Sequence, residues 1–568
     1  MVRRRIPEDI RNYPFDLIVI GAGINGSGIA RDAAMRGLKV LLLDKGDISN
    51  GTTQWATRLI HGGLRYLEYY EVPLVRESLK DREILLHIAP HLVKPLGFMV
   101  PIYDRAKHGP LMVRLGMIAY DTLSLDKSLD NHHMLSPDEA LQREPGLNPE
   151  GLLGAAFYYD AQVEYAERLA VENAISAREH GAVVLTYAEV ERLAREGDRV
   201  VGVEFTDALG EGSYSARASV TVNVAGPWVD EVLGESHGRP MIGGTKGSHL
   251  VVDPFPGAPK GEALYVEARK DGRPYFIVPW NGRYLIGTTD IRYRGDLDYI
   301  SADEEEIDYL IEETNYVIPE ASLSRESVLF TYSGVRPLPY QPEGAEGSVT
   351  RSHIVYDHAR GQGIGTKRTG MGEGVSRVDG LITIVGGKLT TYRNLSRQTV
   401  DMVYTKLDRE APESHTARMP LPGGETRDFQ NFAAEFKATS GLTDELAERL
   451  LKLYGARAPV VLEMAGDDPS LRMPLGPAAT VESGIIGAEV LYAFRREMSR
   501  TLSDVLLRRT MVGLGPQVGL DVDEAAAQVA VRHLGWDEER AGREVEQYRR
   551  YVERYKPKSM MGEEPATA

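Results

Sequence analysis

The sequence predicts an α/β fold in three parts: a Rossmann-like nucleotide-binding domain, an antiparallel-β domain interleaved with it, and a C-terminal α-helical domain. Three observations lead to this prediction. A strand, a glycine-rich turn, a helix and a second strand follow one another near the start of the chain; short β segments with Gly and Pro turns occupy its middle; and helical spacing dominates after residue 410. A chain of 568 residues exceeds one ordinary core, so two or three domains are expected.

The first unit begins with an apolar, β-branched run at Phe15–Ile20, which is typical of a buried strand. The spacing G-x-G-x-x-G follows at 21–26, then a helix-compatible segment at 27–36. A second apolar strand at 39–43 ends in an acid, Asp44. A lone glycine fingerprint also occurs where glycines serve packing alone, but this order of elements favours a dinucleotide cradle.

Each glycine of the cradle has a physical role. Gly21 permits the tight turn, Gly23 lets a pyrophosphate approach the backbone, and Gly26 lets helix and strand pack closely. The free amides of the new helix then face the phosphates. Asp44 can accept hydrogen bonds from ribose hydroxyls and would repel a 2′-phosphate, so the pattern favours FAD or NAD over NADP.

Composition excludes several classes of protein. The net charge of −17 argues against nucleic-acid binding, which needs a basic surface. The chain has no cysteine, which excludes disulfides, thiolate metal sites and cysteine-linked flavin. The basic start is followed by Ile6-Pro7-Glu8-Asp9 rather than an apolar core, so it does not resemble a signal peptide. No apolar run reaches about 18 residues, so we expect a cytoplasmic protein able to rest on a membrane surface without spanning it.

The segment 59–66 (Leu-Ile-His-Gly-Gly-Leu-Arg-Tyr) is unusual for a packing element. Its glycines would let the backbone approach a flat ring, while His61 and Arg65 supply a titratable group and a fixed cation. A surface turn with a hydrogen-bonded histidine explains the same spacing equally well.

Further elements follow in order. Residues 74–88 have helical apolar spacing. Residues 110–120 are apolar with one cation, which suits either an interfacial amphipathic helix or a buried helix, and we favour the buried one. A helix at 163–180 and a strand at 182–186 indicate that the nucleotide-binding domain resumes, and a strand ending at Gly226-Pro227 suits a second close backbone approach to the cofactor.

The middle of the chain predicts an antiparallel sheet, with strands at 249–252, 275–278 and 284–286. The glycine-rich stretch 360–377 has the composition of a mobile loop. An apolar strand from 381 then delivers Gly386 and Gly387 to a new helix, whose N-terminus can hold an anion or a carbonyl oxygen.

Taken together, these motifs resemble those of the FAD-dependent glycerol-3-phosphate dehydrogenases. The similarity rests on the glycine fingerprint with Asp44 and on segments spread over nearly the whole chain: 59–68, Gly287-Thr288-Thr289-Asp290, 333–338, 386–393 and 497–510. The His-Gly-Gly-Leu-Arg-Tyr and Gly-Gly-Lys-Leu-Thr-Thr-Tyr-Arg motifs are far more specific than the fingerprint.

This resemblance implies FAD as cofactor and oxidation of sn-glycerol 3-phosphate to dihydroxyacetone phosphate, with electrons passed to membrane quinone. The enzyme would dock on the inner face of the membrane; a homodimer is compatible with the sequence. It further implies a discontinuous FAD-binding domain, predicted at 12–75, 160–245 and 352–409, and a substrate-binding domain, predicted at 76–159 and 246–351. A helical domain is predicted at 410–556. The residues at 557–568 themselves predict a disordered tail.

Oxidising a secondary alcohol needs a base for the hydroxyl proton and cations for the phosphate. Our hypothesis for the base is His61, with His249 in reserve, and Arg336 would hold the phosphate or the developing alkoxide. Arg65 and Lys388 are further cations, and Tyr66 and Thr289 would orient the substrate. The predicted cofactor-binding residues are Gly21, Gly23, Asn25, Gly26, Asp44, Thr52, Thr53, Gly226, Gly387, Leu389 and Thr390. No metal site is predicted.

Three other functions fit parts of the sequence. A glycerol-3-phosphate oxidase would pass electrons to oxygen, but the long internal insertion typical of those oxidases is not evident here. An amino-acid oxidase would need a carboxylate-binding arginine rather than a group of phosphate-suited cations. A non-catalytic flavoprotein would bind FAD without being reduced by glycerol 3-phosphate.

Overall fold

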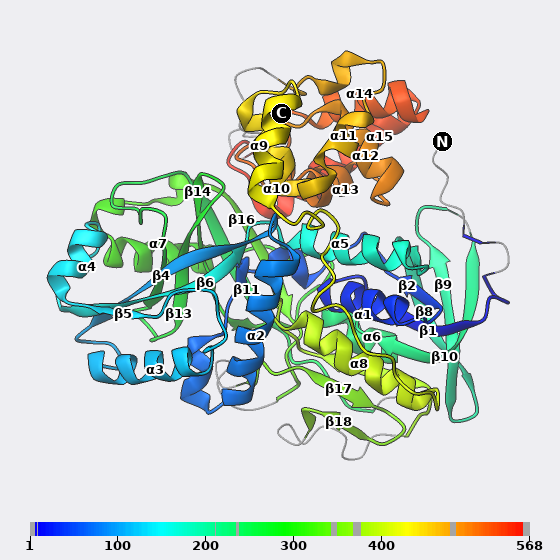
Figure 1. Cartoon of the computed structure of the whole chain (residues 1–568), viewed down its shortest axis with the longest axis horizontal. Coiled ribbons are helices and arrows are strands. Elements are labelled where there is room, and N and C mark those ends of the chain that lie inside the picture. Colours follow the sequence, from blue (N-terminus) through cyan, green and yellow to red (C-terminus); the bar gives the residue numbers. More distant parts are fainter. Residues whose placement is uncertain are drawn as a thin grey trace, which may run out of the picture.

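The computed structural model describes residues 6–7, 10–210, 212–234, 238–341, 349–366, 377–476 and 484–560. Two sheet-based domains lie side by side, and a helical domain lies across one end of both (Figure 1). The predicted α/β fold with a C-terminal helical domain is therefore confirmed.

The first sheet is the nucleotide-binding one. Its central strands β7, β2, β1, β10 and β19 run parallel, and β17 and β18 extend one edge antiparallel. An antiparallel hairpin, β8 and β9, continues from β10. The strands are β1 (Phe15–Ile20), β2 (Val40–Leu43), β7 (Val183–Leu185), β8 (Ala188–Glu196), β9 (Arg199–Asp207), β10 (Ser213–Asn223), β17 (Ile354–Asp357), β18 (Gln362–Ile364) and β19 (Leu381–Val385).

Helices α1 (Ile24–Met35), α5 (Ala166–Glu179) and α8 (Tyr392–Lys406) pack together against this sheet (Figure 1). Small residues make the packing close: a Cβ on Gly28 of α1 would lie within 2.7 Å of Tyr392 and Ser396 side-chain atoms of α8. The short α6 (Val229–Leu233) follows β10. Segments far apart in sequence therefore form one continuous core.

The second sheet has the order β15-β11-β14-β13-β12-β4-β6-β3, with β16 beside β11 and β5 beside β6. Its pairs are antiparallel except β4 and β12, which a long stretch of chain separates. The short β3, although inside the predicted range 12–75, belongs here through β6. The strands are β3 (Leu59–Ile60), β4 (Val93–Tyr103), β5 (His133–Leu135), β6 (Leu152–Val163), β11 (Thr245–Val252), β12 (Ala263–Glu267), β13 (Pro274–Trp280), β14 (Arg283–Gly287), β15 (Ile291–Arg292) and β16 (Val328–Arg336).

Four helices accompany the second sheet: α2 (Val72–Ile88), α3 (Pro110–Thr122), α4 (Pro137–Arg143) and α7 (Glu304–Val317). The prediction that 110–120 is a buried helix is wrong. In α3 Met117 and Tyr120 are buried and Val113 packs partly buried against the core, whereas the remaining large apolar side chains, Leu111, Met112, Leu115 and Ile118, are exposed to solvent.

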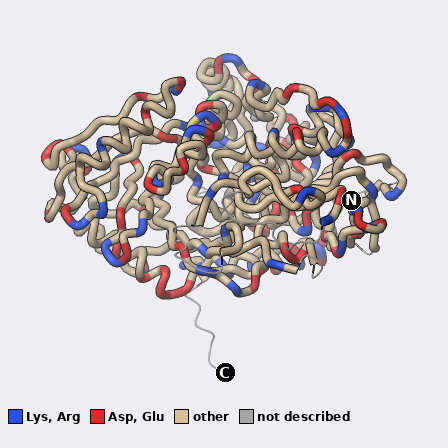
Figure 2. The backbone as a smooth tube through the Cα atoms, turned by 90° about the horizontal axis from the view of Figure 1, so that it is seen from below, with Lys and Arg blue, Asp and Glu red and all other residues tan. Residues whose placement is uncertain are grey.

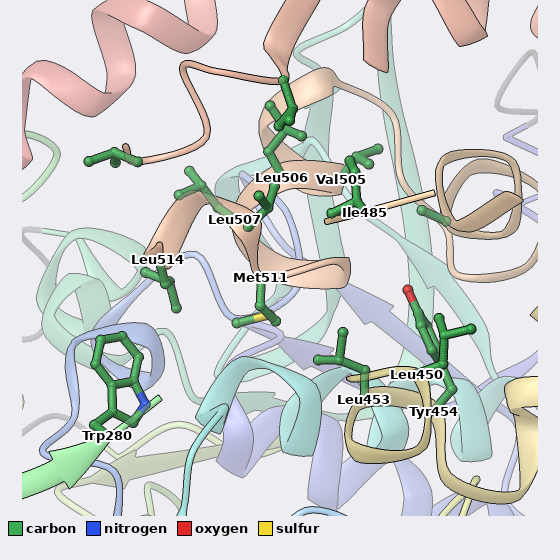
Figure 3. Close-up of a cluster of buried hydrophobic side chains, with 14 of the residues drawn as sticks. Trp280, Leu450, Leu453, Tyr454, Ile485, Val505, Leu506, Leu507, Met511 and Leu514 are labelled. Carbon is green, nitrogen blue, oxygen red and sulfur yellow. The ribbon is translucent and has the colours of Figure 1, made fainter. Parts of the chain in front are cut away.

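The C-terminal part is helical, as predicted: α9 (Phe429–Thr439), α10 (Asp444–Tyr454), α11 (Ala458–Glu463), α12 (Gly487–Arg496), α13 (Leu502–Asp504), α14 (Asp523–Leu534) and α15 (Glu538–Val552). Figure 3 shows its core, where Met511 and Leu514 approach Trp280 of β13 in the second sheet. The helical domain and the second sheet therefore share one hydrophobic cluster.

Two predicted irregular segments are partly described. Residues 362–364 form the edge strand β18, while 367–376 lie outside the described residues. At the predicted tail, the Lys558 amide donates to Leu329 O (2.8 Å), so the chain is still held against β16 at that point, and 561–568 lie outside the described residues.

A buried ion cluster joins the helical domain to the first sheet. Asp47, between β2 and β3, accepts from Arg508 Nε (2.7 Å) and from both terminal nitrogens of Arg509 (2.9 and 2.8 Å). The side chains of all three residues are buried.

Removing the Asp47 carboxylate should destabilise this junction, because it leaves two guanidinium groups buried without their main partner, a loss of about 3–5 kcal/mol. We expect Asp47→Ala to unfold at clearly lower temperature than wild type in a thermal melt followed by circular dichroism. Glu546→Ala, which removes the partner of exposed Arg550, is the control and should change the free energy of unfolding by less than about 1 kcal/mol. Equal shifts in the two variants would contradict a structural role for the cluster.

Candidate active site

A cavity of about 510 Å³ lies between the two sheets. It is lined by the turn after β1, by the segment 50–61, by 224–228 after β10, by 384–390 after β19, and by Gly334 and Arg336 of β16. The carboxyl ends of β1, β10 and β19 thus open onto the same space, the position at which parallel α/β sheets bind ligands.

The floor of the cavity depends on missing side chains. Gly21 has a φ of +107°, and a Cβ there would lie 2.7 Å from Val224 O of the neighbouring segment. A Cβ on Gly26 would overlap the carbonyl oxygen of Gly21. Gly23 is the N-cap of α1, so the helix begins at the cavity with its free amides toward it.

Polar side chains surround the start of α1. Thr53 Oγ1 accepts from the Ile24 amide (3.0 Å), and Thr52 Oγ1 donates to Val335 O (2.6 Å) of the second sheet. Asn25 Nδ2 donates weakly to Gly386 O (3.4 Å), whereas Asn25 Oδ1 is buried without a partner among the described residues. A hydrogen-bond donor on a ligand bound at this end of the cavity would give Asn25 Oδ1 a partner.

Asp44 at the end of β2 is oriented by the backbone. Its Oδ2 accepts from the Ala22 amide (2.6 Å) and its Oδ1 from the Gly46 amide (2.8 Å). Burial raises the pKa of the Asp44 carboxyl to about 6. Further hydrogen bonds from ribose hydroxyls would favour its ionised form.

The segment after β19 lies opposite this cradle, and Gly226, Gly387 and Leu389 line the cavity. Thr390 fixes the backbone of His61 through two bonds: the His61 amide donates to Thr390 Oγ1 (3.1 Å), and Thr390 Oγ1 donates to His61 O (3.3 Å). One hydroxyl therefore joins the two most specific motifs of the sequence.

His61 and Lys388 meet in the buried part of the cavity. Burial, with a smaller contribution from the charge of Lys388, lowers the pKa of His61 to about 3, so its imidazole is neutral at physiological pH. Burial also lowers the pKa of Lys388, whose Nζ donates to Ser78 Oγ (2.9 Å) and lies 4.5 Å from the centre of the Tyr66 ring.

A second group of charges lies at the end of β16. Arg336 contacts Asp290 Oδ1 (3.1 Å) and Thr288 Oγ1 (3.0 Å), while Arg351 contacts the other oxygen of Asp290 (2.9 Å). Burial raises the pKa of Asp290, but the charges of Arg336 and Arg351 outweigh it and lower that pKa below its usual value. Two cations around one carboxylate leave a net positive charge, which suits a phosphate.

Three residues that the sequence predicted for substrate binding or proton transfer make other contacts. The Thr289 hydroxyl is used within the protein, accepting from the Ser248 amide (2.9 Å) and donating to Glu306 (2.5 Å). Arg65 does not line the cavity; its guanidinium lies over the ring of Tyr69 at 5.9 Å. His249 does line it, but its Nε2 bonds Thr57 Oγ1 (3.0 Å) and its ring stacks on Tyr332.

Sequence reasoning missed two residues. Arg351 also lines the cavity, but no motif surrounds it. Asp160 of β6 is buried behind the His61 loop, where it accepts from Arg82 (2.6 Å) and Tyr120 (2.7 Å) and, weakly, from the Gly62 amide (3.4 Å). A buried acid in an apolar strand is the signal that could have identified it.

Comparison with known proteins agrees with this geometry. Residues 16–392 match the family model described as FAD dependent oxidoreductase, and residues 414–541 match the C-terminal domain of alpha-glycerophosphate oxidase. The chain is 46% identical over 563 residues to a glycerol-3-phosphate dehydrogenase of Synechocystis sp., covering 97% of this chain and 98% of that protein. It is 32% identical to an aerobic glycerol-3-phosphate dehydrogenase of Staphylococcus aureus, covering 89% and 88%.

Solved structures show the same relationship. The glycerol-3-phosphate dehydrogenase of Bacillus halodurans, solved in complex with FAD, matches with a TM-score of 0.74 at 28% identity over 96% of both chains. An L-alpha-glycerophosphate oxidase of Mycoplasma pneumoniae matches with a TM-score of 0.53 at 16% identity, covering 71% of this chain and 98% of that one, a likeness of fold alone.

The fold and the cradle define a FAD-dependent oxidoreductase. The cavity fits that cofactor on its own geometry: glycines without room for a side chain, an unpartnered Asn25 oxygen, and an acid in place for ribose hydroxyls. Within that class, the chain belongs to the FAD-dependent glycerol-3-phosphate dehydrogenase family.

Cofactor affinity should depend on pH through Asp44. The pKa of the Asp44 carboxyl is about 6 in the free protein. Below that pH the carboxyl is protonated, so it must lose a proton before it can accept hydrogen bonds from the ribose hydroxyls as a carboxylate. We expect the Kd for FAD, measured by flavin fluorescence on apoprotein, to rise by up to about tenfold per pH unit below pH 6 and to level off above it. Asp44→Asn should bind FAD more weakly at pH 7.5 and lose this dependence. An unchanged pH profile in the variant would show that another group is responsible.

Proposed function

We propose that the protein oxidises sn-glycerol 3-phosphate to dihydroxyacetone phosphate and passes the electrons to membrane quinone, while resting on the inner face of the membrane. The observation that carries the proposal is the grouping of a neutral histidine with separate cations in a FAD-type cavity. The 46% identical relative that is named for this substrate supports it.

The phosphate would be held at the β16 end of the cavity. Arg336 and Arg351 are already positioned there by their shared carboxylate, Asp290, so little side-chain freedom is lost when they bind an anion. Lys388, on the opposite segment, supplies a further charge that burial leaves poorly solvated. Tyr66, which lies beside Lys388, would border the three-carbon chain of the substrate.

His61 would take the proton from the C2 hydroxyl. The bound FAD supplies the hydride acceptor. Since its imidazole is neutral in the free enzyme, His61 has a lone pair available across the physiological pH range. The positive charge that it gains would then lie near the negative charge of the substrate phosphate, which raises its pKa and improves it as a base.

Quinone is favoured over oxygen as the acceptor for two reasons. The relatives at 46% and 32% identity are named dehydrogenases. In addition, the long internal insertion expected of the oxidases is not evident in the sequence.

An anaerobic titration tests the proposal. Glycerol 3-phosphate should bleach the absorbance of the enzyme-bound flavin, and a soluble quinone analogue should restore it rapidly, whereas oxygen should restore it slowly. Both half-reactions are measured by stopped-flow absorbance. Rapid recovery with oxygen would instead identify an oxidase. A flavin that glycerol 3-phosphate never bleaches would exclude both and favour the amino-acid oxidase or the non-catalytic flavoprotein.

His61→Asn tests the base. We expect the variant to keep its FAD and its KM for glycerol 3-phosphate within a few-fold, while the rate of flavin reduction falls by about 10²- to 10⁴-fold, because the proton has no acceptor. His87→Asn, a change on the exposed side of α2, is the matched control and should reduce flavin at the wild-type rate. Near-normal turnover in His61→Asn would transfer the role to another group, with His249 the next candidate.

A further inference from the structure

An apolar surface surrounds helix α3. Almost half of the exposed large apolar side chains among the described residues lie between residues 69 and 125, although this stretch is about a tenth of the chain. Leu111 is 73% exposed, Met112 57%, Leu115 54% and Ile118 46%. We call the following set the α3 patch: Tyr69, Tyr70, Val72, Leu111, Met112, Leu115 and Ile118.

The patch belongs to a helix that is fixed in place. On the inner face of α3, Tyr120 is buried and its hydroxyl donates to Asp160 Oδ2 (2.7 Å), which ties the helix to β6. Positions 111, 115 and 118 are spaced by four and three residues, so they share the outer face of the helix. The exposure is therefore the consequence of a defined orientation rather than of a loose segment.

The two tyrosines join the patch through a short 3₁₀ helix, η2 (Leu64–Tyr69). This element packs against α3, and Lys107, just before α3, donates to Glu68 of η2 (3.0 Å). Tyr70, which directly follows η2, is 85% exposed. Exposed aromatic rings beside an aliphatic helix face are the arrangement found at membrane–water interfaces.

The charges around the α3 patch indicate which kind of partner it fits. Arg114 is exposed on α3, whereas Lys107 is paired with Glu68. The acid of this helix, Asp121, is paired with Lys127 and His132, in a protein whose net charge is −17. Figure 2, seen from below Figure 1, shows acidic and basic residues interspersed over the rest of that face. An anionic lipid surface complements an apolar helix face bearing Arg114, whereas a second copy of this acidic chain would bring net repulsion.

The position of α3 suits a helix that lies on a membrane rather than one that crosses it. Among the described residues no helix is long and apolar enough to cross a bilayer, and α3 runs along the outer edge of the molecule, away from the helical domain (Figure 1). The patch is also close to the cavity: η2 carries Tyr66, which lines the cavity, three residues before Tyr69 of the patch.

We propose that the α3 patch is the surface through which this protein binds anionic lipid membranes. Leu111, Leu115 and Ile118 enter the acyl boundary, Tyr69 and Tyr70 lie at the headgroups, and Arg114 contacts lipid phosphate. This inference rests on the proposed function in one respect, since it gives the peripheral docking a place and brings the cavity near a lipid-dissolved acceptor.

Vesicle flotation with the full-length holoenzyme tests the patch. The vesicles contain equal parts of phosphatidylcholine and phosphatidylglycerol. We expect the triple variant Leu111→Gln, Leu115→Gln, Ile118→Gln to lose at least tenfold in vesicle partitioning. The matched control is Leu153→Gln, Leu209→Gln, Met473→Gln, three exposed apolar residues elsewhere, and it should bind as wild type does. Flavin content and thermal melts establish that each variant is folded.

A second variant separates charge from burial. Arg114→Gln should weaken binding to these vesicles several-fold and leave binding to pure phosphatidylcholine vesicles unchanged. Wild-type protein that fails to float, or a triple variant that floats like wild type, would overturn the proposal. A triple variant that changes only the oligomeric state would instead assign the patch to a contact between copies of this chain.

The proposed function is read out separately, by bleaching of the flavin with glycerol 3-phosphate in the absence of vesicles. The triple variant should bleach at the wild-type rate, because no residue of the patch lines the cavity. Vesicle binding without bleaching would exclude the proposed reaction but leave the patch supported. Bleaching without vesicle binding would support the proposed reaction and overturn the role of the α3 patch.

Discussion

The structure depends on one close approach of main chain to main chain. Gly21 lies against the carbonyl of Val224, and Gly26 lies against the carbonyl of Gly21, so β1, α1 and the end of β10 meet with no side chain between them. Native interiors are packed too densely for even one extra methyl group at such a contact. The elements at the cofactor end of the cavity are positioned by this junction, because α1, β2 with Asp44, and the 224–228 segment all start or end there.

Electrostatics divides the cavity into two ends. At the Asp44 end an acid and free helix amides face the expected ribose and phosphates, and at the β16 end cations are held around Asp290. Between them, burial lowers the pKa of His61 to about 3 and also lowers the pKa of Lys388. In the proposed reaction, the negative charge of the bound substrate would offset the positive charges near His61, so binding of the anion would favour the proton transfer.

The sequence predicted what local spacing encodes. The cradle, Asp44 and the His61 loop are contiguous motifs whose geometry follows from strand, turn and helix preferences, and they meet in one cavity. Arg351 could not be predicted, because it reaches Asp290 from 61 positions away and has no motif of its own. The sequence also could not show that Thr289 lies outside the cavity lining, since its hydrogen bond to Glu306 depends on how α7 packs. For α3 the apolar spacing was visible, but periodicity cannot distinguish a face turned to the core from one turned outward.

The walls of the cavity are contributed along almost the entire chain, from Ile20 to Arg554. During biosynthesis the glycine cradle leaves the ribosome hundreds of residues before Thr390 arrives to fix His61, and before Tyr551 and Arg554 close the wall from the helical domain. The complete cavity can therefore form only after nearly the whole polypeptide has been synthesised. A chain shortened near its C-terminus would lose part of the cavity while retaining every motif of the cradle.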